Sequence, residues 1–339
     1  MAAADSEEHA NGHATPHAHD AHGEPRPRWR NYTAFVLSGG GARGAFQVGA
    51  LRALLEHGER PQLIVGTSIG AWNGAMLAHS PTLAQLDTLA DLWRSAHPVR
   101  VLLGREPVAG TRPQAVRGML MLAAAQRVAA GHPSLYGDAG LHQFVVKSLG
   151  EGATFEDLTI PLRVIATDMT RGARTVLSSG LLAPAVLASS AIPGVFPPVR
   201  IGDTVYVDGG VVDNASLETA LAMGARRIFI VDVGLDPASA GPWGDMGEAP
   251  KPSRRHRSTL AFTMADVLER TVQVTSHYHL RRAIERAPRG VQIHVINAAR
   301  GVRGGSLAFD KAAAWIEQGY AAADEYLRAQ SVSAAETVG

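Results

Sequence analysis

Short apolar runs alternate with longer segments of helical periodicity along most of this chain. Strands are predicted where three to seven mostly apolar residues follow one another, at 33–37, 63–65, 162–167, 204–207, 227–233 and 291–296. Helices are predicted where apolar residues recur at helical spacing, at 45–55, 71–77 and 83–93. Alternating strands and helices are typical of a largely parallel sheet that helices cover on both faces. The pattern therefore predicts the α/β class.

Three segments fall outside this alternation. Residues 1–30 hold five histidines and almost no large apolar side chain, which predicts a disordered tail; metal binding by these histidines is the less favoured interpretation. Residues 236–258 hold four prolines and the basic run Arg254–Arg257, which predict an irregular surface loop. Residues 331–339 are expected to form a frayed end. We therefore expect one domain over 31–330.

Composition narrows the possible functions. The 339 residues carry 32 basic and 31 acidic side chains, a balance that disfavours nucleic acid as a partner. Cysteine is absent from the sequence, which excludes disulfides, cysteine metal sites and a cysteine nucleophile. A run of about 18 apolar residues, long enough to span a membrane, does not occur, and neither does a secretory signal pattern. We expect a cytoplasmic protein whose contact with membranes, if any, is transient and peripheral.

A glycine loop follows the first predicted strand. Gly39, Gly41 and Gly44 match G-x-G-x-x-G, which also occurs in dinucleotide sites. The acidic residue that a dinucleotide site needs after the second strand is missing, and so is the lysine of a phosphate-binding loop. Exposed amides of Gly39, Gly40 and Gly41 beside a helix N-terminus would instead stabilise an anion, as an oxyanion hole does. Arg43 and Gly44 are then expected to position the loop.

A nucleophile elbow follows the second predicted strand. Residues Gly66-Thr67-Ser68-Ile69-Gly70 match G-x-S-x-G between an apolar run and a helix. Such a turn holds its serine in a strained conformation, and Gly66 and Gly70 clear the space around it. Ser68 is the predicted nucleophile.

The base that a serine nucleophile needs is predicted to be an aspartate. His294 alternates with apolar residues in a predicted strand and His277 lies on a predicted helix, so structural roles are expected for both. Asp208 ends the strand 204–207 and precedes Gly209 and Gly210, which places it with Ser68 at the carboxyl edge of one sheet. The alternatives are a turn-forming role for Asp208 and, as other candidate bases, Asp168, Asp213 and Asp232.

These motifs together resemble those of the patatin-like phospholipase family. The resemblance covers about residues 32–327 and is based on the glycine loop 39–44, the elbow at Ser68, the block 188–198 and Asp208-Gly209-Gly210. It implies a three-layer α/β/α fold with a mostly parallel central sheet, and hydrolysis of lipid esters by a dyad of Ser68 and Asp208 without a metal or cofactor. It also implies that Asp168 belongs to a structural turn. Asn214-Ala215-Ser216 stands where the family often has Asn-x-Pro, which affects the expected loop geometry; as a glycosylation sequon it is discounted.

The sequence as a whole indicates a serine acyl hydrolase that acts on carboxylic esters, with lipids as the expected substrates. A nucleotide-binding protein and a catalytically silent membrane-surface module are the alternatives. The apolar stretch 119–125 lies outside the motifs, and core packing and contact with lipid are equally compatible with it. The lipid head group, the chain length and the oligomeric state are not encoded in any pattern that we identify.

Overall fold

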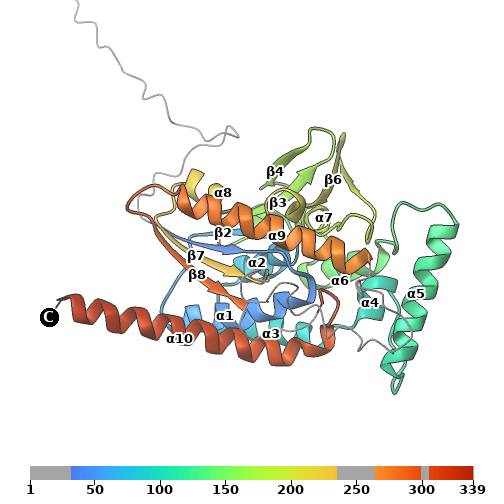
Figure 1. The fold of residues 1–339 in the computed structure, drawn as a ribbon, viewed down its shortest axis with the longest axis horizontal. Coiled ribbons are helices and arrows are strands. Elements are labelled where there is room, and N and C mark those ends of the chain that lie inside the picture. Colours follow the sequence, from blue (N-terminus) through green and yellow to red (C-terminus); the bar gives the residue numbers. More distant parts are fainter. Residues whose placement is uncertain (1–31, 235–263, 299–304, 339) are drawn as a thin grey trace, which may run out of the picture.

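A computed structural model describes residues 32–234, 264–298 and 305–338 of the chain, and Figure 1 shows its central sheet with helices on both sides. The predicted tail 1–30 and loop 236–258 lie outside the described residues. The strands are β1 Thr33–Leu37, β2 Leu63–Thr67, β3 Leu162–Asp168, β4 Ala173–Leu177, β5 Val199–Ile201, β6 Thr204–Asp208, β7 Arg227–Asp232 and β8 Gln292–Asn297. The α-helices are α1 Ala45–Glu56, α2 Ile69–His79, α3 Leu83–Ser95, α4 Pro98–Leu103, α5 Pro113–Ala129, α6 Ala139–Leu149, α7 Leu182–Ser189, α8 Leu217–Ala222, α9 Met264–Glu285 and α10 Ala312–Val338.

The sheet is mostly parallel, as predicted, but one end of it is antiparallel. Its order is β5-β6-β3-β2-β1-β7-β8, with β4 also paired to β3. The strands from β3 to β8 along this order pair in parallel, whereas β4, β5 and β6 make antiparallel pairs. The connection from β3 to β4 spans only a few residues, and a connection that short allows only antiparallel pairing. The pattern analysis missed β4 and β5.

The two faces of the sheet bury different helices. On β1, Phe35 and Leu37 pack with α1, α2, α3 and α10, whereas Ala34 and Val36 pack with α8 and α9. This division follows from the two-residue period of a strand, which sends successive side chains to opposite faces. The α/β class and the three-layer α/β/α arrangement are confirmed.

Two strands, β2 and β6, pair with the same edge of β3, and this arrangement brings Ser68 and Asp208 together. β2 pairs with β3 as far as the partners Thr67 and Ile165, and β6 takes over from the next residue, where Asp208 lies opposite Ala166. Because β6 is antiparallel to β3, it runs toward the end of β2. The last residue of β6 therefore meets the residue that follows β2, which is Ser68.

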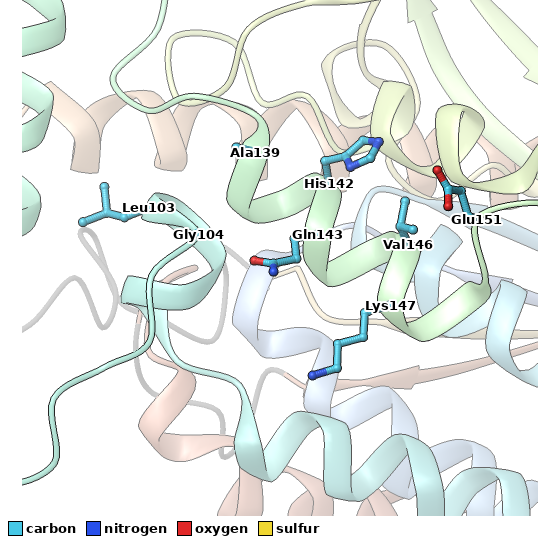
Figure 2. A pocket seen from close by; sticks show the side chains of 8 residues that line it. All are labelled: Leu103, Gly104, Ala139, His142, Gln143, Val146, Lys147 and Glu151. Atoms are coloured by element: carbon cyan, nitrogen blue, oxygen red, sulfur yellow. The ribbon is translucent and has the colours of Figure 1, made fainter.

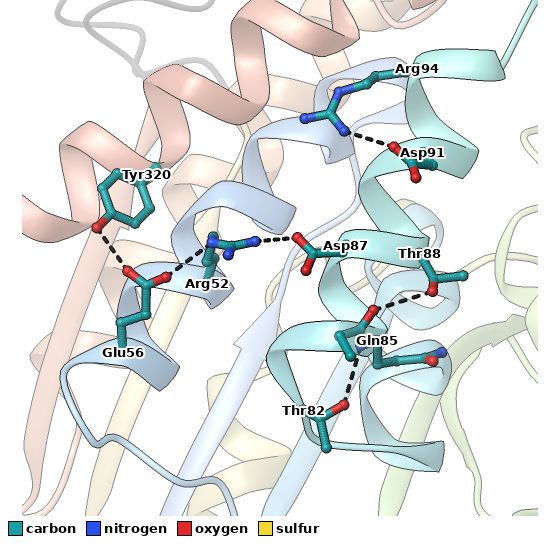
Figure 3. Close-up of polar contacts among 10 residues, drawn as sticks. Arg52, Glu56, Thr82, Gln85, Asp87, Thr88, Asp91, Arg94 and Tyr320 are labelled. Atoms are coloured by element: carbon teal, nitrogen blue, oxygen red, sulfur yellow. Dashed lines mark hydrogen bonds and ion pairs between the residues drawn. The ribbon is translucent and has the colours of Figure 1, made fainter.

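Helix α1 packs very closely on α10. A Cβ atom added at Gly49 would overlap the carbonyl oxygen of Ile316, and one added at Gly319 would overlap that of Phe46. Polar contacts surround this crossing (Figure 3): Glu56 accepts hydrogen bonds from Arg52 and from the Tyr320 hydroxyl, at 3.0 and 2.8 Å. The backbone contact requires glycine at both positions.

The C-terminus differs from the expectation. Helix α10 continues to Val338, past residue 330, where we expected a frayed end. Residues 331–338 contain neither glycine nor proline, so nothing in the local sequence ends the helix.

We predict that Gly49→Ala destabilises the protein strongly, by about 3 kcal/mol or more, because the new methyl group must push α1 away from α10. Gly118→Ala in α5 is the matched control, since its Cβ would meet no atom within 4 Å. The control should leave the thermal unfolding midpoint unchanged or raise it slightly. Equal midpoints for the two variants would contradict the close packing of α1 on α10.

Candidate active site

Ser68 occupies a strained turn between β2 and α2. Its φ of 54° is positive, and among the described residues it is the only non-glycine residue with that property. The two elbow glycines make the turn sterically possible, since a Cβ at Gly70 would overlap the Leu37 carbonyl and one at Gly66 would crowd the start of α2. A non-glycine residue keeps this conformation only when its surroundings hold it there.

A buried serine that the sequence analysis gave no role holds this turn. Ser189, the last residue of α7, accepts a hydrogen bond from the Ser68 backbone N–H at 2.7 Å. Its own hydroxyl donates to the Ile165 carbonyl at 2.6 Å. The sequence held one signal for this role, which is a polar residue at the end of an otherwise apolar helix. Such a serine is expected to be buried, and a buried hydroxyl needs hydrogen-bond partners.

Asp208 lies directly against the hydroxyl of Ser68. The Ser68 Oγ donates to Asp208 Oδ2 at 2.6 Å, and the Gly210 N–H donates to Oδ1 at 2.7 Å. The backbone of Asp208 is fixed as well, through its N–H to the Ala191 carbonyl at 2.9 Å and its carbonyl to the Thr167 hydroxyl at 2.8 Å. This aspartate can therefore accept a proton from the serine without moving.

Burial raises the pKa of the Asp208 carboxyl to about 6, although the hydrogen bonds from Ser68 and Gly210 lower it. The side chain is only 6% exposed, so loss of hydration disfavours its charged form. A carboxylate with this pKa is a stronger base than an ordinary aspartate and is still mostly ionised at neutral pH.

The glycine loop lies against Ser68, but its three amides are not equivalent. A Cβ at Gly39 would come within 2.9 Å of Ser68 Cβ. The Gly39 N–H already donates to the carbonyl and side-chain oxygens of Asn214, at 3.2 and 3.1 Å, and Asn214 Nδ2 donates back to the Gly39 carbonyl at 3.1 Å. Within the described ranges the amides of Gly40 and Gly41 meet no acceptor. The structure thus leaves the amides of Gly40 and Gly41 without an acceptor among the described residues, and it adds Asn214 as a clamp on Gly39 that the sequence analysis did not foresee.

Arg43 and Gly44 anchor the far side of this loop. The Arg43 Nε donates to the Val233 carbonyl at 3.1 Å, and the side chain is buried. The Gly44 carbonyl accepts from Asn73 Nδ2 at 2.9 Å, and Asn73 in turn bonds Gln47 and Trp93 inside the core. Both residues therefore lie where the loop-positioning hypothesis requires them.

The three other candidate aspartates lie in structural contacts. Asp168 accepts from the backbone N–H groups of Thr170 and Arg171 at 2.7 and 3.0 Å, which is the structural turn that the resemblance implies. Asp213 pairs with an arginine, Arg174, at 2.7 Å. Asp232 accepts from the Gly234 N–H and from Asn297 at the ends of β7 and β8, at 2.9 and 3.0 Å. The hydrogen bonds made by these three carboxylates do not involve Ser68.

The two histidines considered as bases also lie apart from the pair. His294 bonds the Tyr326 hydroxyl at 3.1 Å and stacks on Phe229, with ring centroids 4.6 Å apart, and burial lowers its pKa. His277 lies on α9, near enough to Asp232 to oppose the rise that burial causes in the pKa of that carboxyl. Across the described residues, neither Ser68 nor Asp208 hydrogen bonds to a histidine.

A surface pocket of about 580 Å³ lies elsewhere, between the end of α4 and α6 (Figure 2). Its walls include Leu103, His142, Lys147 and Glu151, but neither member of the Ser68–Asp208 pair. In the part of the chain that the structure describes, no group of three His, Asp or Glu side chains is arranged to hold a metal ion. No helix there is both long and apolar enough to cross a bilayer.

Comparison with known proteins gives consistent matches. The chain is 33% identical over 209 residues to patatin-like phospholipase domain-containing protein 7 of Rattus norvegicus, and 28% identical over 319 residues to lysophospholipase NTE1 of Mycosarcoma maydis. These regions are 60% and 86% of this chain but only 14% of either relative. The solved structure of VipD from Legionella pneumophila aligns with a TM-score of 0.44 at 17% identity, over 88% of this chain and 67% of that one. The family model for patatin-like phospholipases matches residues 35–221, more than half of the chain and including both Ser68 and Asp208, so this chain belongs to the patatin-like phospholipase family.

Proposed function

We propose that this chain is a serine hydrolase that cleaves carboxylic ester bonds of lipids through an acyl-enzyme. The observation that carries the proposal is the 2.6 Å hydrogen bond from the Ser68 hydroxyl to Asp208, on a turn whose backbone is strained and braced. Family membership supports a lipid ester as the substrate, and one of the relatives is named a lysophospholipase.

In the first half of the proposed reaction, Ser68 Oγ attacks the ester carbonyl carbon while its proton passes to Asp208 Oδ2. The carbonyl oxygen becomes an oxyanion that the amides of Gly40 and Gly41 stabilise; one such donor is typically worth about 3 kcal/mol. The intermediate then collapses, the bond to the alcohol breaks, and the alcohol leaves with the proton held by Asp208. Ser68 now carries the acyl group.

In the second half, a water molecule gives its proton to Asp208 and attacks the acyl carbon. Collapse of the second intermediate returns the proton to Ser68 Oγ and releases the carboxylic acid. Asp208 acts as base and then as acid in both halves, which suits a carboxyl group whose pKa burial has raised to about 6.

The nucleotide-binding alternative has little support in the geometry of the loop. Gly39 directs its amide to Asn214, and a Cβ at Gly41 would overlap the Ser306 carbonyl, so the loop is enclosed by protein on two sides. A silent membrane-surface module would keep the same fold without turnover. The experiments below separate it from an enzyme.

A fluorophosphonate probe should label Ser68, because its hydroxyl lies on a strained turn and donates to the buried Asp208 carboxylate. Ser68→Ala should abolish labelling and reduce ester hydrolysis by several orders of magnitude. Ser95→Ala, which changes a surface serine of α3, serves as the control and should label normally. Ester hydrolysis that survives Ser68→Ala at the normal rate would refute the proposal.

Asp208→Asn should abolish turnover without loss of fold. The asparagine can still accept from Gly210 and donate toward Ser68, but it cannot take the proton. His294→Gln and His277→Gln should stay within about tenfold of the original rate, since neither ring contacts the pair. If either histidine variant, folded by circular dichroism, loses several orders of magnitude, a triad replaces the dyad.

The pH dependence of rate and stability should report on the same carboxyl. Because Asp208 must be ionised to act as base, kcat/KM should fall as pH drops below about 6. Its pKa in the folded protein lies above the ordinary aspartate value of 3.8, so the stability that its protonated form supplies is present below about pH 4 and lost as pH rises through 6. Asp208→Asn should therefore gain up to about 3 kcal/mol relative to the original chain above pH 6 and nothing below pH 4, as measured by denaturant unfolding. A stability difference that does not change with pH would contradict the buried, raised-pKa carboxyl.

A further inference from the structure

Exposed apolar side chains gather on and around α5. Fourteen large hydrophobic side chains are exposed among the described residues, and six of them lie within one short stretch of the chain. These are Val108, Met119, Met121, Leu122, Val128 and Leu135. Met121 and Leu122 are 59% and 61% exposed. Core packing, one of the two interpretations of the stretch 119–125, is therefore wrong for Met121 and Leu122.

The opposite face of α5 packs on a small apolar cluster near the candidate active site. Leu120 and Ala124, one helical turn apart, pack against the cluster of Leu102, Tyr136 and Phe196, and so do Ile192 and Val195. The segment 192–196 directly follows Ala191, whose carbonyl accepts from the Asp208 N–H at 2.9 Å. The helix is thus fixed on one side, through this cluster, to the segment that binds the Asp208 backbone, and exposes its other side.

The charge around the exposed face has one sign. No aspartate or glutamate occurs between Glu106 and Asp138, whereas Arg112 and Arg117 are exposed on α5 or at its start. A third arginine, Arg127, is turned inward and donates to the Ser134 carbonyl at 3.1 Å. A stretch of 31 residues without an acidic side chain is notable in a chain whose total charge is nearly balanced. The surface therefore combines apolar and cationic groups.

We propose that the outer face of α5, defined by Met119, Met121, Leu122 and Val128 with Arg112 and Arg117, docks on an anionic lipid surface. Apolar side chains of such a helix enter the boundary between head groups and acyl chains, and the arginines pair with anionic head groups. An apolar patch of this kind marks an interaction site, and the missing acidic residues fit a negatively charged partner.

The position of α5 in the fold agrees with this role. Figure 1 shows α5 at the margin of the molecule, on the far side of α4 from the sheet, so a flat surface can reach it without meeting the sheet. Docking there would bring a bilayer next to the cluster that joins α5 to the segment after Ala191, whose carbonyl binds the Asp208 backbone. The idea that docking brings the chain to its substrate rests on the proposed lipid hydrolysis. The docking surface itself rests only on the exposure and charge of the residues on α5.

The test uses the full-length Ser68→Ala chain, which cannot degrade the lipid, with vesicles of phosphatidylcholine and of phosphatidylcholine mixed with phosphatidylglycerol. Sedimentation with the vesicles should show binding to the mixed vesicles that weakens as salt is added. Adding Met121→Ser and Leu122→Ser should weaken this binding at least about tenfold, because two apolar side chains no longer enter the lipid. Adding Arg112→Ala and Arg117→Ala should remove the preference for phosphatidylglycerol.

The matched control changes two exposed apolar residues on another helix, Val272→Ser and Val274→Ser on α9, and should bind as before. Circular dichroism checks each fold, and Leu122→Ser alone replaces the double variant if that variant does not fold. Three results would overturn the proposal: a folded α5 variant that binds vesicles as before, an α9 control that loses binding equally, or a chain with unchanged α5 that does not bind vesicles. So would a dimer that the α5 changes dissociate, since a second copy would then be the occupant. Fluorophosphonate labelling of the unmodified chain is measured separately: its failure counts against the hydrolase proposal and leaves the vesicle result intact.

Discussion

The positive φ of Ser68 is the constraint around which the candidate site is organised. A residue with a side chain enters this conformation only if the protein compensates its cost, which is of order 1–3 kcal/mol. The compensation is visible in the hydrogen bond from the Ser68 N–H to Ser189 and in the close approach of Gly70 to the Leu37 carbonyl. The same turn directs the hydroxyl toward Asp208. Loss of the hydrogen bond to Ser189 would therefore disturb the position of the Ser68 hydroxyl even if Ser68 and Asp208 themselves stayed unchanged.

The close approach of Ser68 and Asp208 arises from an irregularity in the sheet and not from its regular parallel part. In a purely parallel sheet, neighbouring strands end at the same edge, so the residues that follow them lie side by side. Here β6 continues the edge of β3 where β2 stops and runs the opposite way, so Asp208 approaches Ser68 end to end. This arrangement keeps both side chains almost buried, and burial in turn raises the pKa of the aspartate.

Local features of this protein were predictable from the sequence, and features that depend on distant partners were not. The strands near 33–37, 63–65 and 227–233 and the elbow at Ser68 follow from apolar runs and from glycine spacing, which are local signals. The direction of β6 does not follow from local sequence. We expected Asp208 and Ser68 to meet because both would lie at the carboxyl edge of one sheet. They do meet, but β6 runs antiparallel to β3. Ser189 and Asn214 act across separations of 121 and 175 residues, and no short motif announces such a partnership. The irregular end of the sheet was missed because β4 and β5 are short and carry many exposed or half-buried positions.

The sheet order has a consequence for where a minimal version of this protein could be cut. The family match ends at residue 221, whereas β7 begins at Arg227 and lies between β1 and β8. A fragment that stops at the end of the match would leave β1, which leads into the glycine loop, as an edge strand paired only with β2. It would also lack Val233, whose carbonyl receives Arg43, and α10, on which α1 packs. The stretch that identifies the family is thus shorter than the stretch that can fold, and an autonomous unit has to extend through α10.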